Sequence, residues 1–243
     1  MLFRSLQAVR QLLGLEMGSI RIGGGATAAS YLLPPIISAV RKKHPGIRFY
    51  IREAGSTYVA QAVLSGELDL GIVTLPVRVP GDNDLLTLPL VDDELRLIVP
   101  PGHPLSGPRA PGGNSPANTS RFKPGRTAPT FRWKDLANEP IIGFEAGSAV
   151  RELLDHAAAA AGVRLDVVME LRSIQSIMEM VAAGIGVGFV SRFALRPGSR
   201  FGQGLVCRDG KLSRKLAIVR RRDQVPSPAA AEFERLLAAS RGR

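Results

Sequence analysis

Short runs of apolar residues alternate along the chain with longer segments in which apolar residues recur every three or four positions. Strand and helix patterns that alternate in this way are typical of a parallel α/β fold, and we expect two such lobes. The predicted strands are IRI (20–22), IRFYIRE (47–53), LDLGIV (68–73), ELRLIVP (94–100), PIIGF (140–144), LDVVMELR (165–172), GVGFV (186–190) and LAIV (216–219). Between and after them, helices are predicted from Leu32 to His44, over about 57–66, 148–161 and 173–184, and from Ser227 onward.

Both ends of the chain carry helical patterns. Ser227 followed by Pro228 is a typical helix start, and the expected inner face of that last helix consists of Ala231, Phe233, Leu236 and Leu237. At residues 1–17 one apolar stripe is formed by Leu2, Leu6, Val9 and Leu13. Polar residues interrupt this segment, which indicates an amphipathic helix rather than a signal peptide, and an exposed stripe predicts self-association into a homodimer or homotetramer.

The composition agrees with this predicted fold and adds few constraints to it. The 243 residues are 45% hydrophobic and 22% charged, as in an ordinary globular protein with one large or two small domains. No segment is long and apolar enough to span a membrane, so we expect a cytoplasmic protein without a membrane partner. The single cysteine, Cys207, excludes a disulfide framework and is expected to be a small buried hydrophobe. The net charge of +11 is concentrated in 109–134 and 192–222, which we interpret as solvated basic surface, and the Pro/Gly/Ser-rich loop 106–130 is predicted to be flexible.

The glycine-rich turn after the first strand admits two interpretations. Gly23, Gly25 and Ala28 satisfy G-x-G-x-x-A, the dinucleotide-binding fingerprint. However, Pro34-Pro35 predicts that the regular helix starts only near Leu32, with an extended loop over 23–30. A basic run, Arg41-Lys42-Lys43, also stands where a ribose-binding acid is expected. We therefore expect no cofactor and favour a loop that binds an anion such as a carboxylate.

Small hydroxyl residues recur at the predicted strand-to-helix junctions. Thr27 and Ser30 follow the first strand, and further examples are Ser56-Thr57, Gly147-Ser148 and Ser173. Ligands of open α/β sheets bind at the carboxyl ends of strands, which favours a binding role, whereas each hydroxyl taken alone is as well explained by ordinary helix capping.

Motifs for catalysis are missing from the sequence. His44, His103 and His156 have no catalytic partner at motif spacing, and no metal-ligand cluster is visible. Asp92 and Asp93 are adjacent in a predicted strand, so their side chains are expected to face opposite sides. We expect no catalytic residue, no metal site and no enzymatic activity.

Five stretches together resemble the effector-binding portion of LysR-type transcriptional regulators: GSIRIGGGATAASYLLPPIISAVRKKHPGI, EAGSTYVAQAVLSGELDLGIV, LVDDELRLIVPPGHPL, LANEPIIGFEAGSAVRELL and VAAGIGVGFVS. The resemblance implies two Rossmann-like α/β subdomains joined by two crossover strands, as in type II periplasmic binding proteins. It assigns 18–92 and 215–243 to subdomain I and 93–214 to subdomain II, with 106–130 as an inserted loop. Residues 1–17 correspond to the end of a linker and dimerisation helix.

The resemblance also implies a small-molecule effector in the cleft between the subdomains. Carried over by position, the effector-binding residues are Ala26, Thr27, Ser56, Thr57, Val73, Thr74, Gly147 and Ser148. The retained hydroxyls favour a polar, anionic or carboxylate-bearing effector. The family's winged helix-turn-helix does not occur in these residues, so DNA would be contacted only through a domain outside them. The alternatives are a stand-alone solute-binding protein or receptor of the same fold, and an enzyme on that fold.

Overall fold

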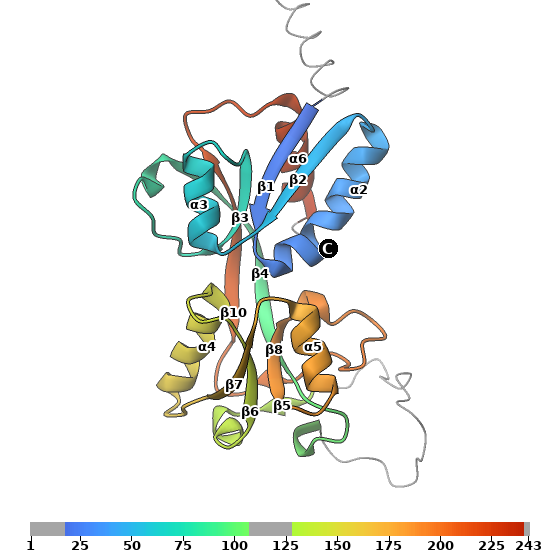
Figure 1. The fold of residues 1–243 in the computed structure, drawn as a ribbon, viewed down its shortest axis with the longest axis vertical. Helices are drawn as coiled ribbons and strands as arrows, with labels where there is room; N and C mark the ends of the chain where they lie inside the picture. Colours follow the sequence, from blue (N-terminus) through green and yellow to red (C-terminus); the bar gives the residue numbers. More distant parts are fainter. Residues whose placement is uncertain (1–17, 107–127, 241–243) are drawn as a thin grey trace, which may run out of the picture. The chain divides into compact units, whose positions relative to one another are not determined.

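A computed structural model describes residues 18–106 and 128–240, which divide into two compact units (Figure 1). The first unit contains 18–92 and 215–240, and the second contains 93–106 and 128–214. The predicted helix at 1–17 and most of the predicted loop at 106–130 lie outside the described residues. None of the helices in the described part is long and apolar enough to cross a membrane.

The first unit is built on a mixed sheet with the order β2-β1-β3-β10. Its strands are β1 (Gly18–Gly24), β2 (Ile47–Glu53), β3 (Leu70–Leu75) and most of β10 (Ser213–Arg221). β1 is parallel to both β2 and β3, whereas β10 is antiparallel to β3. Its helical elements are the π-helix η1 (Ala28–Leu32), α2 (Leu33–Lys43), α3 (Ser56–Leu64), the 3-10 turn η2 (Asp82–Asp84) and α6 (Pro228–Ala239).

Helices cover both faces of this sheet, which explains why β3 is apolar on nearly every position. One face packs Ile20, Ile22 and Ile72 against α2 and α6, with Phe233 of α6 fully buried. On the other face, Val73 packs against α3. In Figure 1, α2 and α6 lie on one side of the unit's strands and α3 on the other. The carboxyl ends of the parallel strands β1, β2 and β3 lie at one edge of this sheet.

Helical geometry after β1 begins earlier than the sequence predicts. Gly23 and Gly24 belong to β1 and helical geometry begins at Ala26, so the predicted extended loop over 23–30 is wrong. The regular α-helix α2 does begin at Leu33, which confirms the predicted start near Leu32. The π-helix η1 explains the difference, because the Leu33 N–H bonds to the Ala28 carbonyl and a new α-helical ladder begins there, with the prolines in its first turn. Because helical geometry is not interrupted before Pro34 and Pro35, the proline argument against a dinucleotide cofactor no longer holds. The basic run at 41–43, which stands where a ribose-binding acid is expected, still disfavours such a cofactor.

The second unit has a sheet of the order β4-β8-β6-β7. Its strands are part of β4 (Leu85–Ile98), β6 (Pro140–Phe144), β7 (Asp166–Leu171) and β8 (Val187–Ser191), with a separate parallel pair, β5 (Thr130–Phe131) and β9 (Val206–Cys207). β6 is parallel to β7 and β8, and β4 is antiparallel to β8. The helices are α4 (Ala149–Ala160) and α5 (Ile174–Ala182), with 3-10 turns η3 (Pro104–Ser106), η4 (Trp133–Leu136) and η5 (Arg192–Ala194).

Two strands connect the units: β4 passes from the first to the second at Asp92-Asp93, and β10 returns at Arg214-Lys215. The predicted fold of two Rossmann-like α/β units joined by two crossover strands is confirmed. β4 begins at Leu85, nine residues before the predicted strand at 94, because the sequence pattern did not reveal its first half. Ala231, predicted on the inner face of the last helix, is exposed, and Ala229 and Ala230 are buried in its place.

Candidate functional site

Three segments meet at the carboxyl edge of the sheet in the first unit: the turn after β1, the turn after β2 and the end of β3. The Ala54 N–H donates to the Gly24 carbonyl at 3.0 Å and joins the first two segments. The Thr74 N–H donates to Ser56 Oγ at 2.9 Å and joins the second and third. Of the predicted site residues, Ala26, Thr27, Ser56, Thr57 and Thr74 therefore lie on connected segments, although 18 to 50 residues separate these segments in the sequence.

The glycines of the turn after β1 have two different roles. A Cβ on Gly23 would lie 2.5 Å from Leu68 Cδ1, and one on Gly24 would lie 2.8 Å from Ala28 Cβ, so both positions require glycine for close packing. A Cβ on Gly25 would meet no atom closer than the Ala54 carbonyl at 3.9 Å, and Gly25 is exposed. The backbone at Gly25 is thus open to a ligand.

Two helices in the first unit start without a side-chain cap. Helical geometry begins at Ala26, after Gly25, and the Thr27 side chain makes no capping hydrogen bond at the N-cap of η1. α3 follows Gly55, and no side-chain capping hydrogen bond is made at that start either. The N–H groups of a first helical turn have no partner inside the helix. By contrast, the serine before each of α4, α5 and α6 accepts a backbone hydrogen bond: Ser148, Ser173 and Ser227. The uncapped starts at Gly25 and Gly55 are therefore suited to bind an anion.

Ser56 supplies a hydroxyl beside these helix starts. Its oxygen accepts the Thr74 N–H, which leaves the O–H free to donate to another group. Ser56 is half-buried and Thr57 is exposed in the first turn of α3. An oriented hydroxyl that donates is matched to a carboxylate or phosphate oxygen.

Other predicted site residues are less available. Thr27 and Thr74 are 4% and 9% exposed and both have partners within the protein. Val73 turns its side chain into the core against α3, so only its backbone could meet a ligand. In the second unit, Ser148 Oγ accepts the Arg151 N–H at 3.3 Å as an ordinary helix cap, and Gly147 has a φ of 78° in the turn before it. The capping alternative thus describes Ser148 but not Ser56.

An ionic network in the second unit was not predicted from the sequence, because its members lie far apart along the chain. Asp93 is fully buried, and its carboxylate accepts hydrogen bonds from Ser191 Oγ at 2.6 Å and from Arg214 Nε at 2.9 Å. Burial raises the pKa of Asp93 above its ordinary value, and the Arg214 guanidinium and the Ser191 hydroxyl oppose this rise without reversing it. Asp92 is exposed, which confirms that the two aspartates face opposite sides. The network fixes the point where β4 enters the second unit.

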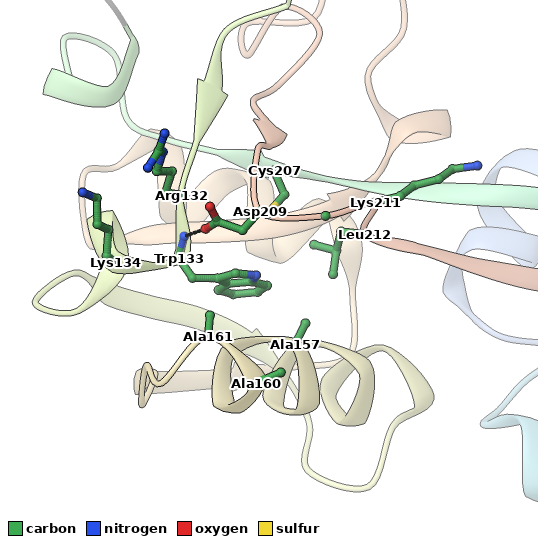
Figure 2. A pocket seen from close by; sticks show the side chains of 11 residues that line it. Arg132, Trp133, Lys134, Ala157, Ala160, Ala161, Cys207, Asp209, Lys211 and Leu212 are labelled. Atoms are coloured by element: carbon green, nitrogen blue, oxygen red, sulfur yellow. Dashed lines mark hydrogen bonds between the residues drawn. The ribbon is translucent and has the colours of Figure 1, made fainter.

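A cavity of about 550 Å³ lies elsewhere in the second unit (Figure 2). Trp133 lies beside Ala157 and Ala160 of α4 and Ala161 just after it, and the Trp133 backbone N–H donates to Asp209 Oδ2 at 2.7 Å. None of the predicted site residues lines this cavity.

Beyond these turns, the described residues also include a buried cysteine and a histidine–glutamate pair. The described residues contain no group of three or more His, Cys, Asp or Glu side chains placed to hold a metal ion. Cys207 is buried, as predicted, and burial raises the pKa of its thiol, which makes it less reactive. His103 Nε2 lies 3.2 Å from Glu139, in a pair without a nucleophile among its described contacts.

Comparison with known proteins identifies the family. Residues 13–112 and 124–241 match the model of the LysR substrate binding domain. The chain belongs to this family.

Among curated relatives, a probable RuBisCO transcriptional regulator of Synechocystis sp. is 29% identical over 192 residues, which cover 78% of this chain and 50% of the relative. The chain spans about half the length of several curated relatives that it matches.

Solved structures agree with this fold. The regulatory domain of Synechocystis PCC6803 CcmR in complex with 2-PG has a TM-score of 0.74 at 22% identity, covering 93% of this chain and 99% of that one. The effector binding domain of QuiR in complex with shikimate has a TM-score of 0.69 at 18% identity, covering 93% and 97%.

Proposed function

We propose that this chain is the ligand-sensing part of a LysR-type transcriptional regulator and that it binds a small anionic effector in its first unit. The observation that carries the proposal is the pair of uncapped helix starts at Gly25 and Gly55, joined by hydrogen bonds and flanked by the Ser56 hydroxyl. The positive ends of two helices favour negative charge. We propose Ala26, Thr27, Ser56, Thr57, Val73 and Thr74 as effector contacts in this unit, with Val73 acting through its backbone.

In the second unit, we propose Gly147 and Ser148 as effector contacts. Both lie at the carboxyl end of β6, the position at which ligands of α/β sheets are bound. Effector binding would shift the populations of conformations of a longer regulator that contacts DNA, because the effector binds one conformation more tightly than the other. The protein then acts by binding and not by catalysis.

Two structural neighbours suggest the chemical class of the effector. Their bound molecules, 2-phosphoglycolate and shikimate, each carry a carboxylate. We propose a small carboxylic acid, phosphorylated or hydroxylated, as the effector of this chain.

A thermal-shift panel tests the proposal. We expect 2-phosphoglycolate or shikimate to raise the midpoint of unfolding by about 5–10 °C at about 100 times its dissociation constant. The methyl ester of shikimate is the matched neutral control for shikimate and should give no shift. Inorganic phosphate at the same ionic strength controls for non-specific binding to a chain of net charge +11. Equal shifts with acid and ester, or no shift with any small carboxylic acid, would refute the proposal.

We also propose that the chain self-associates through the edge of its first sheet. β2 is the edge strand, and Tyr50 and Ile51 on it are 55% and 41% exposed. An edge strand with exposed large apolar residues is a ready surface for a second copy. Tyr50→Glu combined with Ile51→Lys is expected to reduce the mass in sedimentation equilibrium toward that of one chain. Val225→Lys changes a residue that is 93% exposed outside any strand and should leave the mass unchanged. An unchanged mass in the β2 variant would place the interface elsewhere.

A further inference from the structure

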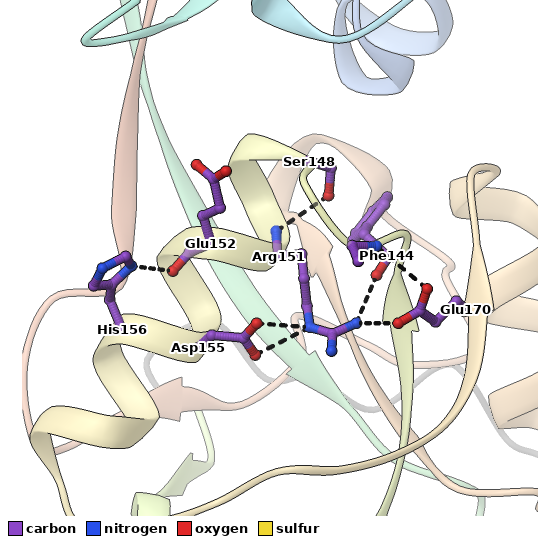
Figure 3. A network of polar contacts seen from close by, with 8 residues as sticks. Phe144, Ser148, Arg151, Glu152, Asp155, His156 and Glu170 are labelled. Carbon is purple, nitrogen blue, oxygen red and sulfur yellow. Dashed lines mark hydrogen bonds and ion pairs between the residues drawn. The ribbon is translucent and has the colours of Figure 1, made fainter.

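The strongest unexplained feature of the second unit is the set of contacts made by Arg151 (Figure 3). Arg151 lies in the first turn of α4, and its side chain is 17% exposed. Nε donates to both oxygens of Asp155 at 3.0 and 2.9 Å. Nη1 donates to Glu170 Oε1 at 2.8 Å and to the Phe144 carbonyl at 3.1 Å. One guanidinium thus links α4, β7 and the last residue of β6.

These contacts fix the turn between β6 and α4 from both sides. The other oxygen of Glu170 accepts the Ala146 N–H at 3.3 Å, and the Ser148 N–H donates to the Glu145 carbonyl at 3.2 Å. The hydrogen bond from Arg151 lowers the pKa of Glu170, so this carboxylate remains an acceptor at neutral pH. Through Phe144 and Glu170, Arg151 therefore restrains the turn formed by residues 145–148.

The geometry argues against two simpler roles for Arg151. All its described side-chain contacts are with acceptors of the protein, so its charge is already balanced and it does not serve as a free cation for a ligand. Asp155 and Glu170 are 48% and 42% exposed, and ion pairs of this exposure add little stability. What a planar guanidinium does provide is a fixed arrangement of several donors, which a lysine ammonium cannot reproduce.

The guanidinium lies against a glycine of β6. A Cβ on Gly143 would lie 3.6 Å from Arg151 Nη1 and 3.2 Å from Val167 Cγ1. At 3.6 Å such a Cβ would be in ordinary van der Waals contact with the guanidinium, so the arginine packs directly against β6 at Gly143.

We propose that Arg151 is a positioning residue that holds the turn of residues 145–148 in the conformation in which Gly147 and Ser148 bind the effector. This inference rests on the proposed function, because it takes Gly147 and Ser148 to be effector contacts. Arg151 does not touch the effector and acts through the turn.

Hydrogen exchange tests the positioning step without any ligand. Arg151→Met is expected to raise the exchange rates of the amides at 146 and 148 about tenfold, because their hydrogen bonds open more often. Arg151→Lys should behave like Arg151→Met, because lysine keeps the positive charge but cannot donate at once to Asp155, Glu170 and the Phe144 carbonyl. Glu170→Gln keeps one acceptor oxygen for two donors, Arg151 Nη1 and the Ala146 N–H, so it should raise exchange less than Glu170→Ala, which should resemble Arg151→Met. Arg235→Met, which breaks an exposed ion pair with Glu232 on α6, is the matched control and should change nothing in the turn. Unchanged exchange in Arg151→Met would overturn the inference.

Titration with 2-phosphoglycolate and with shikimate tests the link to binding. Arg151→Met is expected to weaken the binding of the tighter acid about tenfold. In double-variant cycles its effect should be non-additive with Ser148→Ala and additive with Ser56→Ala. Faster exchange with unchanged affinity, or additivity with Ser148→Ala, would overturn the inference while the proposed function stands. If the wild-type protein binds neither acid, the proposed function fails first and this inference fails with it.

Discussion

Replacing Arg214 with methionine is expected to lower the free energy of unfolding by about 3–5 kcal/mol, because it leaves a buried carboxylate without its cation. Asp93 is fully buried and Arg214 is 9% exposed, so little water is available to compensate. For a chain of this size the loss corresponds to a decrease of about 6–20 °C in the midpoint of thermal unfolding. Chemical denaturation followed by circular dichroism measures it directly.

The pH dependence of the same variant has a definite sign. Without Arg214, the Ser191 hydroxyl and the Arg192 charge remain to oppose the rise that burial causes in the pKa of Asp93. A carboxyl group whose pKa is higher in the folded than in the unfolded state stabilises the fold when protonated, and that contribution is lost as the pH rises through the folded pKa. The deficit of Arg214→Met relative to wild type should therefore be smaller at pH 5 than at pH 8.

Two further variants separate the ion pair from simple loss of an arginine. Arg235→Met removes an arginine that is 60% exposed and pairs with Glu232, so it should change the free energy of unfolding little. Asp93→Leu combined with Arg214→Met removes both charges and should be less destabilised than Arg214→Met alone. If Arg214→Met lies within about 1 kcal/mol of wild type, the buried network does not stabilise the second unit.

The second large effect is expected at Ser56. Ser56→Ala removes the O–H proposed to donate to the effector and leaves the Thr74 N–H without its acceptor. A hydrogen bond to a charged group contributes about 1.5–3 kcal/mol, so the affinity for the anionic effector should fall about 10- to 100-fold. Calorimetric titration of wild type and variant with the same acid measures the difference.

Ser227→Ala is the matched control for Ser56→Ala. Both serines belong to the first unit and both hydroxyl oxygens accept one backbone N–H, but Ser227 caps α6 and is not a proposed contact. Its loss should reduce stability by about 0.5–2 kcal/mol and leave affinity unchanged. Equal losses of affinity in both variants would show that Ser56 acts only through stability.

Local patterns predicted much of the fold. The buried strands are apolar on nearly every position and were found, and Ser148, Ser173 and Ser227 were placed at the starts of helices that they cap. The start at Ala26 could not be predicted from a rule for α-helices, because a π-helical segment lets the chain continue through Pro34 and Pro35. The first half of β4 was missed because exposed and buried positions mix within it.

The candidate site was predictable only in part. Glycines and hydroxyls next to strands indicated the turns, yet nothing in the sequence revealed that Ser56 would accept the Thr74 N–H across 18 residues. Contacts over longer separations were invisible, above all that between Asp93 and Arg214, which are 121 residues apart. Such pairs depend on which strands become neighbours, and hydrophobic periodicity does not encode the partner of a charged side chain.

The most direct test of the central claim is backbone amide chemical-shift mapping of the isotopically labelled chain during titration with 2-phosphoglycolate and with shikimate. We predict that at least one acid shifts the amide resonances of residues 25–27, 56–57 and 74, and that the methyl ester of shikimate does not. Saturable shifts confined to the cavity around Trp133 and Leu212, or no saturable shifts with either acid, would contradict this prediction.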